Sequence, residues 1–240
     1  YRLTYVWQAP LDVFLHARGF QLGSPLFGWQ DPHPVYTLLS VAAGVLFVWV
    51  LLGIAALLGR NRTERVLAVG VVATLGTMQL FFGYVENYPL MTLGVLLYIW
   101  AALRYLRGEL ALVWVAAILA LIHAFHPSTI ILTPSLLYLA FVASPINSWN
   151  ATNAQSVLRG DRLRIDWRRL LSVAVPYAVV FAGVVALMSS GEHGLDALMG
   201  ADFPGGGDRS WFVPLSQITT KWQHYTMFSW AHLVDWLNMQ

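Results

Sequence analysis

Long apolar runs without a charged residue, separated by shorter polar segments, dominate this chain. Six such runs stand out, at residues 35–58, 66–85, 88–103, 110–125, 128–143 and 170–188. A helix needs about 20 apolar residues to cross a bilayer, and the first, second and last runs meet that length. The middle three need their flanking residues, and the fourth and fifth together also fit one re-entrant hairpin. The pattern predicts an all-α, polytopic transmembrane helix bundle of about six spans.

Polar flanks complete the predicted organisation. Within residues 1–34, the stretch 9–23 has apolar positions at helical spacing, which is typical of an amphipathic helix on a membrane surface. We expect one transmembrane domain, with 1–34 as an outer juxtamembrane segment, 35–189 as the six-span bundle and 190–240 as an outer loop with a second surface helix. The chain starts at a tyrosine and stops inside an aromatic stretch, so we interpret it as part of a longer membrane protein.

Composition excludes the main classes of soluble protein. Of the 240 residues, 58% are hydrophobic and only 11% are charged, whereas soluble domains are about 25% charged. This balance excludes a disordered chain, a nucleic-acid-binding module and a cytosolic enzyme, and it indicates an integral membrane protein. The absence of cysteine excludes a disulfide framework, a cysteine-ligated metal and a thiol nucleophile.

Charged residues are distributed unevenly between alternate loops. The loops that follow the first, third and fifth runs hold ten of the 14 basic residues and four acids, a net charge of +6. The other segments hold four basic and eight acidic residues, a net charge of −4, so the total is +2. The positive-inside rule places the arginine-rich loops in the cytoplasm. All seven histidines lie in or near the other segments, so the outer face is the expected working face.

The first candidate site is the turn that leads into the first run. Asp31 and His33 alternate with Pro32 and Pro34, and proline stiffens the backbone on both sides. The functional interpretation is that Asp31 and His33 hold a polar substrate or a metal at the membrane edge. The alternative is a rigid entry turn with solvated side chains.

The second candidate is the turn between the second and third runs. Glu86 lies there between two apolar segments, flanked by Tyr84, Asn87 and Tyr88. An ionisable residue at this depth is costly and therefore indicates function. Glu86 is predicted to be a general base, a metal ligand or an acceptor for sugar hydroxyls, with Tyr84 and Asn87 beside the substrate. The alternative is an interfacial acid stabilised by a helix N-terminus.

A third candidate joins the fourth and fifth runs. His123 and His126 are three residues apart, which puts them on one helical face. Ser128 follows Pro127 at the expected start of the next helix, where free N–H groups favour an anion. The prediction is a phosphate-binding role for His123, His126 and Ser128, against the alternative of histidines that merely cap a turn.

The fourth candidate is the glycine-rich outer loop near the C-terminal end. Asp208 and Arg209 follow three glycines, whose backbone N–H groups are able to converge on an anion. Arg209 is expected to contact phosphate. Asp208 is expected to join Glu86 in binding a divalent cation, Mg²⁺ or Mn²⁺. The alternative is a flexible loop without ligands.

Five segments of the chain follow one another in an order that is informative about its family. They are the surface helix APLDVFLHARGF, the pair of crossings FFGYVENYPLMTLGVLLYIWAALRYLRG, the outer turn HAFHPS, a GGGD loop with FVPL, and the surface segment YTMFSWAHLVDWLN. This order resembles bacterial membrane glycosyltransferases of the GT-C superfamily. The resemblance implies inverting transfer of a sugar from a polyprenyl-phosphate donor, on the outer face of the bacterial cytoplasmic membrane. It also implies a main catalytic acid upstream of Tyr1, which leaves Glu86 and Asp31 in supporting catalytic roles.

Two other functions are consistent with the same sequence. One is a structural or accessory subunit of a larger membrane complex, with its apolar spans as packing faces for protein partners. The other is a transporter, for which Thr133-Pro134 and Pro176 are the only hints of helices broken near mid-membrane. The expected partners of the enzyme are the lipid-linked sugar donor and membrane lipids, and not a nucleic acid.

Overall fold

The computed structural model describes residues 9–82, 88–141, 167–190 and 229–230. Within these ranges every regular element is a helix, and no strand occurs among them. The chain divides into two compact units, residues 1–193 and 194–240. All the helices discussed below belong to the first unit.

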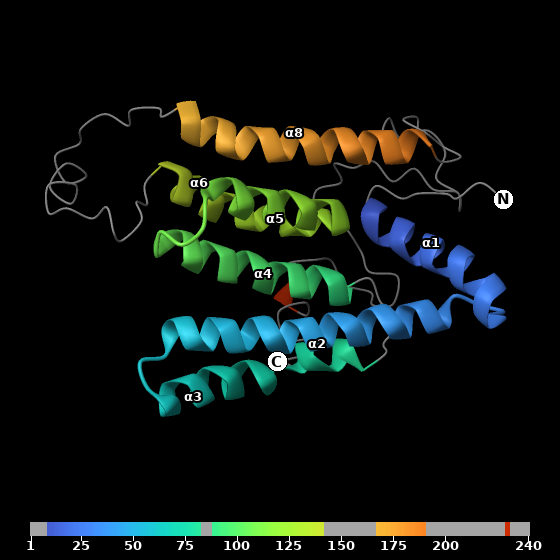
Figure 1. The fold of residues 1–240 in the computed structure, drawn as a ribbon, viewed down its shortest axis with the longest axis horizontal. Helices are drawn as coiled ribbons and strands as arrows, with labels where there is room; N and C mark the ends of the chain where they lie inside the picture. Colours follow the sequence, from blue (N-terminus) through green and yellow to red (C-terminus); the bar gives the residue numbers. More distant parts are fainter. Residues whose placement is uncertain (1–8, 83–87, 142–166, 191–228, 231–240) are drawn as a thin grey trace, which may run out of the picture. The chain divides into compact units, whose positions relative to one another are not determined.

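The predicted apolar runs correspond to helices of very different length. In chain order the elements are α1 (Pro10–Phe27), α2 (His33–Leu58), α3 (Arg62–Ala73), the 3-10 helix η1 (Gly76–Phe81), α4 (Tyr88–Leu106), α5 (Leu112–Phe125), the 3-10 helix η2 (Pro127–Leu132), α6 (Thr133–Phe141) and α8 (Trp167–Ser189) (Figure 1). Three of them, α2, α4 and α8, are long and apolar enough to cross a membrane, whereas α5 and the continuous stretch Pro127–Phe141 are shorter apolar helices. The all-α prediction is confirmed for the described residues, and membrane-crossing length is confirmed for three helices.

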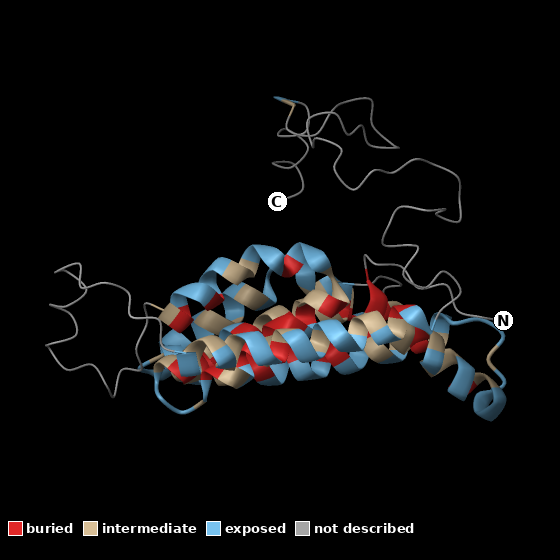
Figure 2. Cartoon of the chain, turned by 90° about the horizontal axis from the view of Figure 1, so that it is seen from above, coloured by how far each residue is buried: buried red, intermediate tan, exposed pale blue. Residues whose placement is uncertain are grey.

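The helices pack side by side, with α4 and α5 in the middle. Helix α4 lies between α2 and α5, and α5 in turn packs on α8 and on α6, while α3 and η1 pack on α2. Two apolar clusters hold these contacts: one is centred on Val115, Leu119 and Leu136, and the other on Phe47, Val50 and Phe81. Figure 2 shows the buried residues inside the bundle and the exposed ones on its outward faces.

The second predicted span, residues 66–85, is not one continuous helix. Helix α3 ends after 12 residues at Ala73, and a separate six-residue 3-10 helix follows. The Thr74 hydroxyl donates to the Val71 carbonyl at 2.9 Å, and Leu75 adopts an extended conformation with ψ 143°. Threonine side chains compete with helical backbone bonds in this way, so an uninterrupted apolar run did not ensure an uninterrupted helix.

Histidines and arginines lie at opposite ends of the bundle, near the termini of its helices. The N-terminal ends of α2 and α4 and the C-terminal ends of α5 and α8 meet at one end, which α1 covers by packing on α2, α5 and α8 (Figure 1). We call this the histidine end, because His16, His33, His123 and His126 lie there. The other end, the arginine end, carries seven described arginines: Arg60, Arg62, Arg65, Arg104, Arg107, Arg168 and Arg169.

Candidate functional site

A buried acid–histidine pair lies on the inner side of α1. Asp12 is 1% exposed and His16 is 5% exposed, and they are one helical turn apart. The His16 Nδ1 atom donates to the Asp12 carbonyl oxygen at 2.9 Å and lies 3.1 Å from the carboxylate oxygen Oδ2. Apart from this contact with His16, neither carboxylate oxygen of Asp12 has a hydrogen-bond partner among the described residues. This is unusual, because a buried carboxylate normally has several hydrogen-bond donors around it.

The sequence of α1 explains how the pair becomes buried. Pro10 occupies the first helical turn, where its missing N–H costs nothing, and Gly28 ends the helix in the left-handed region with φ 69°. Gly19 allows the close approach of α2, because a Cβ atom there would lie only 2.7 Å from a methyl carbon of Val35. This approach lets the His16 ring stack on Tyr36 in the first turn of α2, with ring centroids 3.9 Å apart.

The charge of Asp12 controls the protonation of His16. Burial alone lowers the pKa of His16, but the Asp12 carboxylate, through side-chain contact and charge, and the bond to the Asp12 carbonyl outweigh it. The net effect is that the pKa of His16 is raised above 6.5. Protonated His16 compensates the buried negative charge, which would otherwise be very costly.

His123 has both ring nitrogens engaged inside the bundle. Its Nδ1 atom lies 2.8 Å from the Thr129 hydroxyl, which donates its own hydrogen to the His126 carbonyl. Nδ1 must therefore carry a proton, and in the neutral ring Nε2 accepts from Thr133 at 3.2 Å or Tyr177 at 3.1 Å. A histidine with this set of partners ties α5 to α8 and to the start of α6. These contacts favour a structural role for His123, and its predicted phosphate-binding role stays a prediction.

His126 and His123 do not share a helical face. Helix α5 ends at Phe125, and His126 has an extended backbone with φ −157° and ψ 120°, so it leaves the helix. Its Nδ1 atom lies 2.7 Å from the Ser128 hydroxyl and accepts the Ser128 N–H at 3.3 Å. The helix start expected as an anion site is a six-residue 3-10 helix that His126 itself caps. His126 and Ser128 still form a polar pair, beside Tyr88 of α4 at a ring distance of 5.7 Å.

Asp31 and His33 lie in the turn that leads into α2. Both residues are exposed, and the Asp31 Oδ1 atom accepts the backbone N–H of His33 at 2.9 Å. This bond satisfies one of the free N–H groups at the start of α2 and matches the ordinary behaviour of aspartate before a helix. The geometry favours the structural interpretation of this turn.

Five predicted site residues lie outside the described residues: Tyr84, Glu86, Asn87, Asp208 and Arg209. Their predicted roles stay predictions. Within the described ranges, no group of three or more His, Cys, Asp or Glu side chains is arranged to hold a metal ion. The divalent cation predicted at Glu86 and Asp208 stays a prediction, because both residues lie outside these ranges.

Asp12 and His16 are the residues that sequence reasoning did not select as a site. Their spacing of four residues on one helical face was visible, but the helix was expected to lie on the membrane surface and was not selected as a site. The signal for burial was Gly19, together with Gly23 four residues later, because small residues on the same face as a polar pair permit close packing.

No family model, no curated protein and no solved structure matches this chain. The functional interpretation therefore has to come from the chemistry of the residues themselves. Among the described residues, the group that most needs a functional role is the Asp12 carboxylate, because it is buried there with only His16 as a polar partner.

Proposed function

We propose that the chain crosses a bacterial cytoplasmic membrane six times, with the arginine end in the cytoplasm. In this topology α3 and η1 form one broken crossing and α5 with the stretch Pro127–Phe141 forms two further ones, alongside the three long helices. The gathering of arginines at one end of the bundle and of histidines at the other supports this orientation.

We further propose that the protein is a membrane glycosyltransferase that uses a polyprenyl-phosphate sugar as donor on the outer face. The buried Asp12 carboxylate at the histidine end, which has only His16 as a polar partner among the described residues, is the observation that carries this proposal. A carboxylate with open lone pairs is suited to accept a proton from an acceptor hydroxyl. Asp12 then takes the place of the upstream acid that the GT-C resemblance implied.

The reaction at this site is a single displacement. The acceptor oxygen forms a bond to the anomeric carbon of the donor sugar while its proton passes to Asp12. The bond between that carbon and the phosphate oxygen breaks, and polyprenyl phosphate leaves with the electron pair. Protonated His16 keeps the carboxylate fixed at 3.1 Å, and attack opposite the leaving group inverts the anomeric centre.

The remaining candidates support the donor phosphate in this proposal. His126 and Ser128 lie next to Tyr88 at the histidine end and offer a hydroxyl and a ring nitrogen to an anion. Tyr84, Asn87 and Arg209 are proposed to extend this contact. A divalent cation, Mg²⁺ or Mn²⁺, held by Glu86 and Asp208, would neutralise charge on the leaving phosphate.

The direct test is an assay of sugar transfer. The full-length protein, purified in detergent and mixed with radiolabelled polyprenyl-phosphate sugars and total membrane acceptors, is expected to release labelled product. The rate is expected to fall when Mg²⁺ and Mn²⁺ are chelated. If no polyprenyl-phosphate sugar is consumed by the folded protein, the glycosyltransferase proposal is wrong.

A structural subunit of a membrane complex is the second candidate function, because helix α8 is unusually exposed. Only 6% of the apolar window of α8 is buried, against 39% in α2. A protein partner that covers α8 would account for this difference. Co-purification of a stoichiometric partner from mild detergent, with no sugar transfer by the complex, would favour this candidate over the enzyme.

A further inference from the structure

The loop between α2 and α3 is held rigid by its own hydrogen bonds. The Asn61 side chain accepts the Glu64 N–H at 2.9 Å and donates to the Glu64 carboxylate at 2.9 Å. The second oxygen of Glu64 accepts the Arg60 N–H at 2.7 Å, and Arg65 Nε donates to the Gly59 carbonyl at 3.1 Å. This reciprocal capping fixes residues 59–65 at the arginine end of the bundle.

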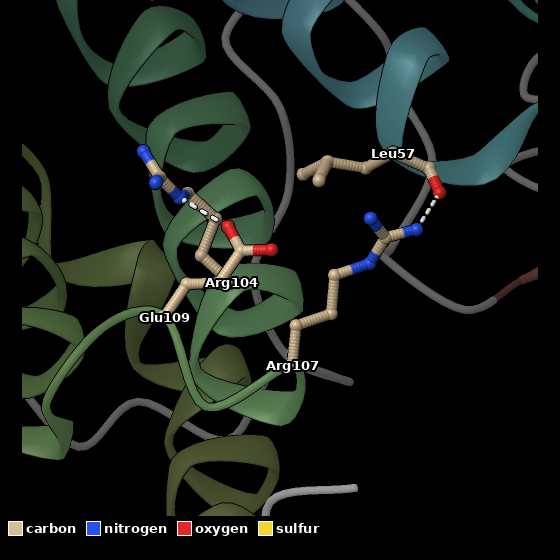
Figure 3. A network of polar contacts seen from close by, with 4 residues as sticks. All are labelled: Leu57, Arg104, Arg107 and Glu109. Carbon is tan, nitrogen blue, oxygen red and sulfur yellow. Dashed lines mark hydrogen bonds and ion pairs between the residues drawn. The ribbon is translucent and has the colours of Figure 1, made fainter. Parts of the chain in front are cut away.

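Most of the arginines at this end are occupied by protein groups. Arg107 donates to the Leu57 carbonyl in the last turn of α2, and Arg104 Nε lies 3.0 Å from the Glu109 carboxylate (Figure 3). Arg169 donates to the Ala140 carbonyl at 3.3 Å in the last turn of α6. Such contacts satisfy free carbonyls at helix C-termini and suit the negative end of the helix dipole. These arginine side chains therefore stabilise contacts within the bundle.

Arg60 and Arg62 are different. Both are exposed, and in the described part of the chain neither guanidinium group has a hydrogen-bond or ion-pair partner. The nearby acid, Glu64, directs its oxygens at the Arg60 backbone and the Asn61 amide instead of at either guanidinium. A rigid loop thus presents two cations that have no acidic partner among the described residues.

An exposed apolar row continues from these cations along α3. Helix α3 has no buried residue, and Val66, Leu67 and Val71 are 61%, 61% and 63% exposed. Leu58, the last residue of α2, is 57% exposed beside the same loop. Figure 1 shows α3 running from the loop back along α2, toward the middle of the bundle. Cations at one end of an apolar row complement a molecule with an anionic head and a hydrocarbon tail.

We propose that this surface binds an anionic phospholipid. Its phosphate contacts the guanidinium groups of Arg60 and Arg62, which bind phosphate in a fork geometry. Its acyl chain lies along Val66, Leu67 and Val71 of α3. The charge at the head of the row selects a lipid over a protein helix, because a purely apolar partner would leave both cations unpaired. The inference does not depend on glycosyl transfer.

Lipid binding to the intact protein tests this proposal. Native mass spectrometry of detergent-solubilised protein, titrated with phosphatidylglycerol or phosphatidylcholine, gives the affinity for each lipid. The wild type is expected to prefer phosphatidylglycerol. The double variant Arg60→Gln/Arg62→Gln is expected to weaken phosphatidylglycerol binding on the order of tenfold, since each basic residue near a headgroup favours anionic lipid. Arg60→Lys/Arg62→Lys retains the charge and should lose less.

Three controls test whether lipid binding depends on this particular surface. Arg18→Gln removes an exposed cation at the histidine end and should leave phosphatidylglycerol binding unchanged. Inorganic phosphate at the same concentration should not compete, because it has no acyl chain. The proposal is overturned if the wild type does not prefer the anionic lipid, if free phosphate competes fully, or if Arg18→Gln has the same effect as the double variant. A dimer that dissociates on Leu67→Ser, with lipid binding unchanged, would assign the α3 row to a second copy and overturn it too.

Discussion

If the protein is the proposed glycosyltransferase, replacing Asp12 by asparagine is expected to lower the rate of sugar transfer by about 10²–10⁴-fold, the usual contribution of a general base. Asparagine has nearly the same size, but its amide does not accept a proton from the acceptor hydroxyl. The site is water-poor, since Asp12 is 1% exposed, so bulk water does not readily replace the lost base. The rate is measured with the full-length protein and a radiolabelled polyprenyl-phosphate sugar.

Asp31→Asn is the matched control, because it makes the same change at an exposed acid of the same end. Asparagine still accepts the His33 N–H in that turn, so transfer should stay within about twofold of wild type. An Asp12→Asn enzyme that retains the wild-type rate would remove Asp12 from the mechanism. Equal losses in both variants would point to a general effect on the fold instead.

The same variant has a second readout in the pH dependence of stability. The pKa of His16 is raised in the folded protein. The contribution of His16 to the free energy of unfolding is therefore complete below pH 6.5, which is the pKa of histidine in an unfolded chain. The contribution is lost as the pH rises through the raised folded-state pKa. Thermal unfolding should therefore show a fall in stability on the alkaline side of 6.5 that Asp12→Asn abolishes. Failure to form α1 would instead lower stability at every pH.

Among the Gly→Ala substitutions at described glycines of α2, α4 and α8, Gly44→Ala is expected to destabilise the bundle most. An added Cβ would lie 2.6 Å from Phe81 Cβ, an atom fixed to the backbone of η1, and not to a flexible side-chain end. Phe81 would have to move away from α2 and from Phe47, whose ring centroid is 4.8 Å from its own. Overpacking of this kind costs about 1–3 kcal/mol. Thermal unfolding in detergent measures the loss.

Gly183→Ala in α8 provides the control for helix propensity. Nothing lies within 4 Å of a Cβ atom at that position, so the change relieves only the poor helix propensity of glycine. It should be neutral or stabilise by up to about 1 kcal/mol. If Gly44→Ala is as stable as Gly183→Ala, the close packing of η1 on α2 is not correct.

The long helices were predictable because their signal is local. The runs at residues 35–58 and 170–188 agree with α2 (His33–Leu58) and α8 (Trp167–Ser189) to within a few residues at each end. The break in the helix predicted over residues 66–85 was harder to predict. It depends on whether the Thr74 hydroxyl donates to the Val71 carbonyl or points away from the helix. Hydropathy alone does not distinguish these states.

The candidate site was less predictable because burial is set by tertiary packing. His123 and His126 have a spacing that fits one helical face, but α5 ends at Phe125, so His126 leaves the helix with an extended backbone. Asp12 lies in a helix that was expected on the membrane surface, and only the approach of α2 past Gly19 makes it a buried carboxylate. Sequence periodicity identifies a face of a helix but not what will cover it.

Single-cysteine labelling most directly tests the central claim, that the two ends of the bundle lie on opposite sides of the membrane. The chain contains no cysteine, so each introduced thiol reports alone. Gln30→Cys lies at the histidine end and Thr63→Cys at the arginine end, and both positions are exposed. A membrane-impermeant maleimide should label Gln30→Cys in intact cells and Thr63→Cys only after permeabilisation. Labelling of both residues from outside, or of Thr63→Cys alone, would contradict the proposed topology and the outer-face site that depends on it.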